Sequence, residues 1–287
     1  MGSDLRKGST VEKYLSELNT IREPFQLIPE WIKEFWRYRE LLYIFVWRDV
    51  KVRYKQTVLG AMWAVIQPFF TMVVFTLFFG KLIKIPSDDI PYPIFSYSAL
   101  LPWTYFSTAL ALAGNSMLSH AGLLQKIYFP RLAIPMSQVL GGLIDFFIAS
   151  VLLIGLMIYY HVPVSRGLLL WPFLILLLVV LALGCGMLLA SINVKYRDIK
   201  HVIPFGIQLW LFVTPIIYPM SIIPNKYHAL IALNPLTGLI EAFRSSLFPY
   251  RKVDWGLLSI SIVMTTFIFI CGLVYFRKTE KYFADII

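Results

Sequence analysis

Charge and cysteine are both scarce in this sequence. Only 15% of its 287 residues are Asp, Glu, Lys or Arg, whereas 58% are hydrophobic. The two cysteines, Cys185 and Cys271, both lie inside long apolar runs, so the sequence offers neither a disulfide framework nor a metal site with paired cysteine spacing. The four histidines are scattered along the chain. We therefore predict neither redox chemistry nor a metal site.

Nucleotide-binding loops and catalytic signatures are also missing. The chain has no G-x-x-x-x-G-K-[ST] sequence and no G-x-G-x-x-G loop, so we expect no ATP site on this chain. It has no H-E-x-x-H or G-x-S-x-G element either. We therefore expect no catalytic residue and no cofactor bound by this chain. An integral membrane glycosyltransferase is the weakest of the functions considered.

The sequence does contain a series of apolar runs of about 20 residues, the length of a helix that crosses a bilayer. The net charge of +10 does not point to nucleic acid, because the basic residues lie beside these runs, where anionic lipid headgroups are suitable partners. The runs predict an all-α integral membrane protein. Its six transmembrane helices are expected near residues 57–79, 97–118, 132–160, 168–194, 202–218 and 257–276.

The distribution of Lys and Arg predicts the orientation of these spans. If the N-terminus is cytoplasmic, the inner segments hold 19 of the 26 Lys and Arg, and the outer segments hold the other 7. Positively charged flanks are retained in the cytoplasm. We therefore expect both termini to be cytoplasmic.

The N-terminal part of the chain differs in composition from the spans. Residues 1–28 are polar and are expected to form a cytoplasmic tail, whereas residues 29–56 predict an amphipathic helix in the membrane interface. The apolar stripe of this helix comprises Trp31, Phe35, Tyr38, Leu42 and Phe45. Four basic residues near its end could meet either anionic lipid or an anionic group of a substrate: Arg48, Lys51, Arg53 and Lys55.

Residues 219–249 are too broken for one crossing and too apolar for a solvated loop. Pro224 and the pair Asn234-Pro235 interrupt the segment, which predicts two short helices that dip back into the outer leaflet. Asn234 is expected to be the N-cap of the second helix, with Pro235 at its first position. Glu241 and Arg244 lie three residues apart on that helix and are expected to pair.

Asp145 is the one acid clearly inside a predicted span. It shares a helical face with small residues, Ser137, Gly141 and Ala149, so it is expected to point into the bundle. An ionisable group at this depth is either a proton or ion relay or a structural hydrogen-bonding group. The sequence shows no basic partner within a span, and both interpretations stay open.

Four stretches taken together resemble the membrane subunit of ABC-2 type exporters, specifically the polysaccharide permeases that export O-antigen (the Wzm type). Capsule and teichoic acid permeases are close relatives. The resemblance covers about residues 31–281, with residues 57–281 as the transmembrane domain. The stretches are RDVKVRYKQTVLGAMWAVIQP (48–68), LLQKIYFPR (123–131), NVKYRDI (193–199) and NPLTGLIEAFR (234–244).

The resemblance implies a homodimer in the bacterial inner membrane, joined to two copies of a separate ABC ATPase subunit. ATP and Mg would bind to that partner, and the cargo would be a lipid-linked polysaccharide. An ABC-2 exporter of a drug or lipid is an alternative, which the neighbouring genes would distinguish. An ion-coupled carrier with Asp145 as its relay is another, and it would need no ATP.

The resemblance also implies roles for particular residues. Residues 122–130 would form a coupling helix that docks into the ATPase, although a surface loop that merely fixes topology is the alternative. Arg48, Lys51, Arg53 and Lys55 would lie at the substrate entrance. Residues 219–249 would form an outer gate, held by Asn234, Pro235, Glu241 and Arg244. The residues expected to contact the ATPase are Leu123, Leu124, Gln125, Lys126, Ile127, Phe129, Pro130 and Arg131.

Overall fold

The computed structural model describes residues 38–55, 57–88, 90–124, 129–196, 198–281 and 283. Within these ranges the regular secondary structure is entirely helical. The longer helices are α2 (Arg39–Tyr54), α3 (Trp63–Phe75), α4 (Tyr92–Ser119), α6 (Ala133–Tyr159), α7 (Trp171–Lys195), α8 (Ile199–Val213), α10 (Pro235–Leu247) and α11 (Trp255–Glu280). The shorter ones are η1 (Gly60–Met62), η2 (Thr76–Leu82), α5 (Ala121–Leu124), η3 (Arg166–Leu170), η4 (Met220–Ile222) and α9 (Asn225–Ala232).

Helical segments coincide with all of the expected spans, and the all-α class is confirmed. Four are long and apolar enough to cross a membrane: Gly60–Leu82, Ala133–Tyr159, Arg166–Lys195 and Trp255–Glu280. The first of these continues from η1 through α3 into η2, a π-helical stretch. The total of six crossings stays a prediction.

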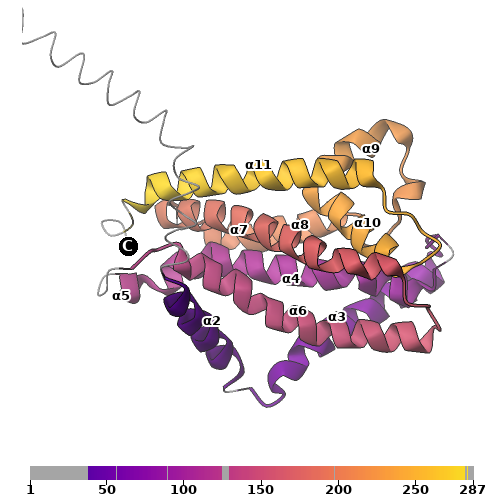
Figure 1. Cartoon of the computed structure of the whole chain (residues 1–287), viewed down its shortest axis with the longest axis horizontal. Helices are drawn as coiled ribbons and strands as arrows, with labels where there is room; N and C mark the ends of the chain where they lie inside the picture. Colours follow the sequence, from indigo (N-terminus) through magenta and orange to yellow (C-terminus); the bar gives the residue numbers. More distant parts are fainter. Residues whose placement is uncertain are drawn as a thin grey trace, which may run out of the picture.

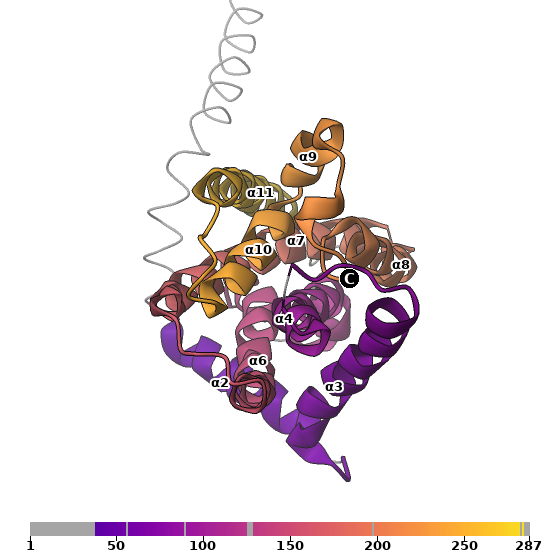
Figure 2. The same cartoon turned by 90° about the vertical axis from the view of Figure 1, so that its right-hand side faces the viewer.

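α4 is the central helix of the bundle. Viewed along the bundle, it is surrounded by α3, α6, α7, α8 and α10, all of which contact it (Figure 2). Two of its tyrosines donate to carbonyl groups of α6: the Tyr97 hydroxyl to Ala149 O at 2.8 Å, and the Tyr105 hydroxyl to Val139 O at 3.1 Å. A helix enclosed in this way can be less apolar than its lipid-facing neighbours.

α8 is shorter than the span expected at 202–218. It ends at Val213, where Thr214 turns to an extended conformation before Pro215. A residue that precedes proline is biased away from the helical region, which explains this end. Its 15 residues correspond to about 22 Å, less than the roughly 30 Å hydrocarbon core. The expectation that this helix reaches Tyr218 is therefore wrong.

α7 and α11 lie side by side along the bundle (Figure 1). Glycine allows their backbones to approach closely. A Cβ atom placed on Gly184 would lie 2.7 Å from the Cα of Phe269, closer than real Cβ contacts. Small residues at such contacts are typical of helix packing in membranes, where close van der Waals contact replaces the hydrophobic effect.

The two ends of the bundle carry different segments (Figure 1). α2, α5 and the end of α11 gather at one end, where Arg131 donates to the carbonyl of Glu280 and Asn193 Nδ2 donates to Gly114 O at 3.0 Å. α9 and α10 lie at the other end. The described segments that we assigned to the cytoplasmic side thus share one end. Which side of the membrane that end faces stays a prediction.

The two short helices expected within residues 219–249 are present as α9 and α10. Asn234 is the N-cap of α10: its side-chain oxygen accepts from Leu236 N at 3.1 Å, and Pro235 occupies the first turn. The same oxygen accepts from Trp210 Nε1 at 2.9 Å, while Asn234 Nδ2 donates to Thr214 Oγ1 at 2.9 Å. One cap residue therefore also fixes the end of α8 against the start of α10.

Candidate functional site

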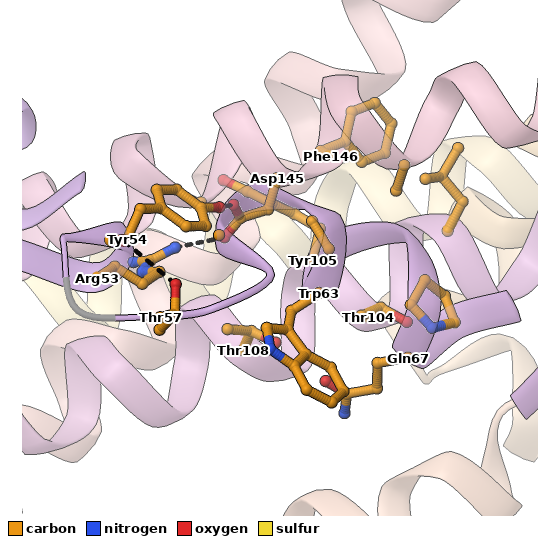
Figure 3. A pocket seen from close by; sticks show the side chains of 16 residues that line it. Arg53, Tyr54, Thr57, Trp63, Gln67, Thr104, Tyr105, Thr108, Asp145 and Phe146 are labelled. Atoms are coloured by element: carbon orange, nitrogen blue, oxygen red, sulfur yellow. Dashed lines mark hydrogen bonds and ion pairs between the residues drawn. The ribbon is translucent and has the colours of Figure 1, made fainter. Parts of the chain in front are cut away.

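A pocket of about 290 Å³ lies under the elbow between α2 and α3, against α4 and α6 (Figure 3). We call it the elbow pocket. Its lining combines hydroxyl, amide, indole and charged groups at positions along otherwise apolar helices. The lining residues are Arg53, Tyr54, Thr57, Gly60, Trp63, Ala64, Gln67, Pro68, Leu101, Thr104, Tyr105, Thr108, Gly142, Asp145, Phe146 and Ala149.

Asp145 has two partners on α2 (Figure 3). Arg53 forms an ion pair with its carboxylate, and the Tyr54 hydroxyl donates a hydrogen bond to it. The Asp145 and Arg53 side chains are each 24% exposed. The basic partner of Asp145 lies outside the predicted spans, as the sequence indicated, and comes from the helix before the first span. A carboxylate held by a guanidinium is stabilised in its charged form.

A second carboxylate, Asp49 of α2, is almost enclosed and was missed as a site residue. It accepts hydrogen bonds from Ser137 Oγ at 2.8 Å and Gln138 Nε2 at 2.6 Å, both on α6. It also accepts from Arg48 Nη2 at 2.7 Å. The signal in the sequence was an acid within the basic stretch RDVKVRYK.

The four basic residues expected at a substrate entrance fall into two groups. Arg48 and Arg53 are engaged within the chain, with Asp49 and Asp145 respectively. Lys51 and Lys55 are exposed, and Lys51 Nζ lies 5.2 Å from the centre of the Trp47 ring. Of the four residues, the two lysines are therefore the ones whose charged groups are exposed and not paired with a carboxylate of the described chain.

The apolar stripe of α2 faces the rest of the chain. Leu42 and Phe45 are buried, whereas Tyr43, Ile44 and Trp47 are exposed on the other side. The location of this helix in the membrane interface stays a prediction. Trp31 and Phe35 lie outside the described residues.

The turn between α4 and α6 differs from a helix spanning 122–130. α5 is described as far as Leu124, and Phe129 and Pro130 have no regular secondary structure, so the predicted coupling helix does not extend to those two residues. Leu123 is half-buried against the core. The side chain of Leu124 and residues 125–128, including Gln125, Lys126 and Ile127, lie outside the described residues.

Phe129 points into the chain. Its side chain is 7% exposed, and its ring packs edge-on against Phe45 with the ring centres 5.3 Å apart. We expected an apolar side chain presented to a partner, and the structure corrects that placement. Pro130 leads into α6, because its carbonyl accepts from Ala133 N at 3.0 Å. Arg131 is engaged with the carbonyl at the end of α11.

At the opposite end of the bundle, Glu241 and Arg244 form the ion pair expected from their spacing, at 3.1 Å. Arg251 extends the pair into a cluster, with Nη1 3.8 Å from Glu241 and Nη2 2.6 Å from Asp88. Neither Arg251 nor Asp88 was expected to take part. The cluster joins α10 to the segments that precede α4 and α11, whereas a gating role for it stays a prediction.

Arg244 is fully buried and has three kinds of partner. Besides Glu241, its Nη2 donates to Pro215 O at 3.1 Å and to Ile216 O at 3.3 Å, and its guanidinium carbon lies 3.8 Å from the centre of the Phe95 ring. The two carbonyls belong to the non-helical segment after α8. Buried backbone of this kind needs a donor, and Arg244 provides it.

The apolar helices and their packing define a multi-pass membrane protein. Similarity to known proteins identifies the family of transporters to which it belongs. The sequence profile of the ABC-2 type transporter matches residues 40–248. The chain belongs to the ABC-2 type transporter family. Its similarity to the polysaccharide permeases expected from the four stretches is confirmed by relatives from several bacteria.

Three relatives illustrate this similarity. The O-antigen export system permease protein RfbA of Myxococcus xanthus is 29% identical over 259 residues, which is 89% of this chain and 98% of that protein. RfbA of Klebsiella pneumoniae is 28% identical over 250 residues, covering 86% of this chain and 95% of that protein. The polysialic acid transport protein KpsM of Escherichia coli is 26% identical over 244 residues, covering 82% and 91%.

Proposed function

We propose that this chain is the permease subunit of an ATP-driven transporter that exports a lipid-linked polysaccharide of the O-antigen type across the bacterial inner membrane. The similarity to O-antigen export permeases carries the proposal, because it extends over 98% of the Myxococcus protein. A homodimer with both termini in the cytoplasm and two copies of an ABC ATPase complete the proposed assembly.

Two features support a separate ATPase partner: the missing phosphate-binding loop and the position of the turn between α4 and α6. No phosphate-binding loop occurs in the sequence, so ATP and Mg would bind to the partner. The turn that carries Leu123 lies at the end of the bundle shared by α2 and the end of α11 (Figure 1). If the partner docks at Leu123 and the residues that follow it, the ATPase lies at the end of the bundle that we propose to be cytoplasmic.

The elbow pocket has the chemistry that a sugar unit needs. Trp63 is 52% exposed and offers a flat face to the CH groups of a sugar ring, while Thr104, Thr108 and Gln67 offer hydrogen-bonding groups to its hydroxyls. The exposed Lys51 and Lys55 are suitable for the phosphate groups of a lipid-linked substrate. Arg48 and Arg53 are less suitable, because carboxylates of the chain already engage them.

Capsule-type polysaccharide export is a second candidate, favoured by the similarity to KpsM. It would differ from O-antigen export in the glycan that is carried. The ion-coupled carrier is less well supported, since Asp145 is paired with Arg53 and a relay must gain and lose a proton.

Reconstitution tests the proposal. The chain is co-purified with a candidate ABC ATPase from the same organism, placed in proteoliposomes with a fluorescent lipid-linked oligosaccharide, and supplied with ATP. We expect translocation that stops when the catalytic glutamate of the ATPase is replaced. Translocation driven by a proton gradient without ATP would contradict the proposal, as would transport of drugs or phospholipids with no movement of the glycan.

A further inference from the structure

α2 is held to α6 by two carboxylates that face in opposite directions. Asp49 extends from α2 to donors on α6, whereas Asp145 extends from α6 to donors on α2, Arg53 and Tyr54. Each helix thus supplies one acid to the other. We call these two groups of contacts the crossed carboxylates. They are spaced along α2 by about one helical turn, since Asp49 and Arg53 are four residues apart.

One end of this contact leads to the turn between α4 and α6. Phe45 packs edge-on against Phe129, and Arg48 Nη2 lies 2.8 Å from His120 Nε2. The Arg48 guanidinium also lies 4.9 Å from the centre of the Phe45 ring. Both described flanks of the turn, His120 and Phe129, therefore contact α2 directly.

The other end of the contact is the wall of the elbow pocket. Arg53, Tyr54 and Asp145 line the pocket together with Thr57, which follows α2 (Figure 3). A displacement of α2 relative to α6 would therefore separate the two groups that close this side of the pocket. Because α2 is one continuous helix of 16 residues, a movement at Phe45 is carried to Arg53.

We propose that Asp145 and Asp49 are positioning residues for transport: the crossed carboxylates hold α2 in the position that closes the elbow pocket, and movement of the turn is passed along α2 to open it. The proposal rests on the proposed function, because it takes the turn to be the place where an ATPase pushes. It assigns the Asp145–Arg53 pair as a latch rather than as a relay.

The kind of contact supports a latch. Apolar side chains would hold two helices together without the cost of partly desolvating two acids and the Arg53 guanidinium. Charge-assisted hydrogen bonds instead define one position sharply and are lost when the groups separate by a few ångströms. Between the crossed carboxylates, Val50 of α2 lies over Gly141 of α6, where a Cβ would be 3.6 Å from Val50 Cγ2, an ordinary van der Waals contact.

Cysteine accessibility tests the latch. Thr104 lines the pocket from α4 and is partly buried, so a Thr104→Cys variant, made with Cys185→Ala and Cys271→Ala, reports pocket opening through its reaction rate with a maleimide. Into this background we place Arg53→Gln together with Asp145→Asn, which removes both charges and leaves neither unpaired. We expect labelling to accelerate roughly tenfold without ATP, the factor that corresponds to loss of one charge-assisted contact.

Two further variants separate a latch from a general structural role. Asp254→Asn is the matched control, because Asp254 caps α11 through Leu257 N and touches neither α2 nor the pocket. It should leave the labelling rate unchanged. Arg53→Lys, with Asp145 intact, keeps a charged donor for that carboxylate. Its labelling rate should therefore be close to the slow rate of the unmodified pair. A general loss of packing would instead accelerate labelling in every destabilised variant, including one at α7 and α11.

Transport by the reconstituted complex completes the experiment. With the double substitution we expect ATP hydrolysis to continue while glycan export per ATP falls several-fold, because the ATPase still turns over but α2 no longer returns to its closed position. Unchanged labelling in the double variant would overturn the latch even if export proceeds. Failure of the unmodified complex to move glycan would overturn the proposed function, while the labelling result would still decide the latch.

Discussion

The guanidinium of Arg244 lies 3.8 Å from the centre of the Phe95 ring and is fully buried at one end of the bundle. Phe95 belongs to the central helix α4 and Arg244 to the short helix α10. The contact ties α10, which we predicted to belong to an outer gate, to the central helix of the bundle. It also determines how substitutions there should behave.

We predict that exchanging the charges of Glu241 and Arg244 will not restore the protein. A carboxylate at position 244 would face the carbonyl oxygens of Pro215 and Ile216 and the electron-rich face of Phe95, all of which repel it. Arg244→Glu and the double exchange should each cost about 3 kcal/mol or more, the typical loss when a buried pair is broken. The melting temperature of the purified protein measures this loss.

Arg251→Ala is the control for this prediction. Its side chain is 21% exposed and its contact with Glu241 is longer, at 3.8 Å, so its loss should lower the melting temperature less than Arg244→Ala. A double exchange that recovered the original melting temperature would show that the ion pair alone matters. The carbonyl contacts of Arg244 would then be incidental.

Asn234 should contribute more than a helix cap. Replacing it by Ser keeps an N-cap acceptor for α10, whereas replacing it by Ala removes the cap at a cost of about 1 kcal/mol. Both changes lose the contacts with Trp210 Nε1 and Thr214 Oγ1. We therefore expect Asn234→Ser to be destabilising and Asn234→Ala more so, by thermal unfolding in detergent. Equal stability of the Ser variant and the original protein would show that the bridge to α8 contributes nothing.

Phe45 and Phe129 should be energetically coupled. Edge-to-face aromatic pairs contribute roughly 0.5–1.5 kcal/mol beyond their burial, so a double-mutant cycle with alanine at both positions should give a coupling energy of about 1 kcal/mol. Leu123→Ala is the contrasting variant: it should weaken co-purification of the ATPase, and because its side chain is only half-buried it should cost less stability than Phe129→Ala. If Phe129→Ala impaired ATPase binding while leaving stability unchanged, the inward position of the ring would be irrelevant to its role.

Gly184 and Gly155 provide a matched pair of glycine substitutions. A Cβ on Gly184 would meet the backbone of Phe269 at 2.7 Å, whereas a Cβ on Gly155 would meet nothing within 4 Å. Gly184→Ala should therefore destabilise the protein by about 1–3 kcal/mol, as overpacking does. Gly155→Ala should be neutral or stabilising by up to about 1 kcal/mol, since alanine favours the helix. Unfolding measurements on both variants test whether α7 and α11 pack as closely as described.

Much of the fold could be predicted because its causes are local. Apolar runs of bilayer length identified the spans, and the pair Asn234-Pro235 marked the start of α10 through an N-cap that the neighbouring backbone satisfies. The spacing of Glu241 and Arg244 likewise brought them onto one helical face. The family resemblance rested on four short stretches of sequence and could be recognised without the structure.

The errors arose where the deciding partner is distant in sequence. The partner of Asp145 was not identified from the sequence, because Arg53 lies 92 residues earlier and outside any predicted span. Phe129 was expected to face outward because its neighbours look like a docking turn, yet Phe45 lies against it. Asp49 was overlooked because its donors, Ser137 and Gln138, are on another helix.

The sequence alone was enough to predict a helical membrane protein, the approximate positions of its long apolar helices, and the segments that gather positive charge. Hydropathy, capping and proline act over a few residues, so the positions of the spans can be predicted from local sequence. Only the tertiary structure decided that α2 packs on α6 and which charges meet. Ion pairs and ring contacts depend on how helices pack in space, and that packing is set by the whole bundle at once.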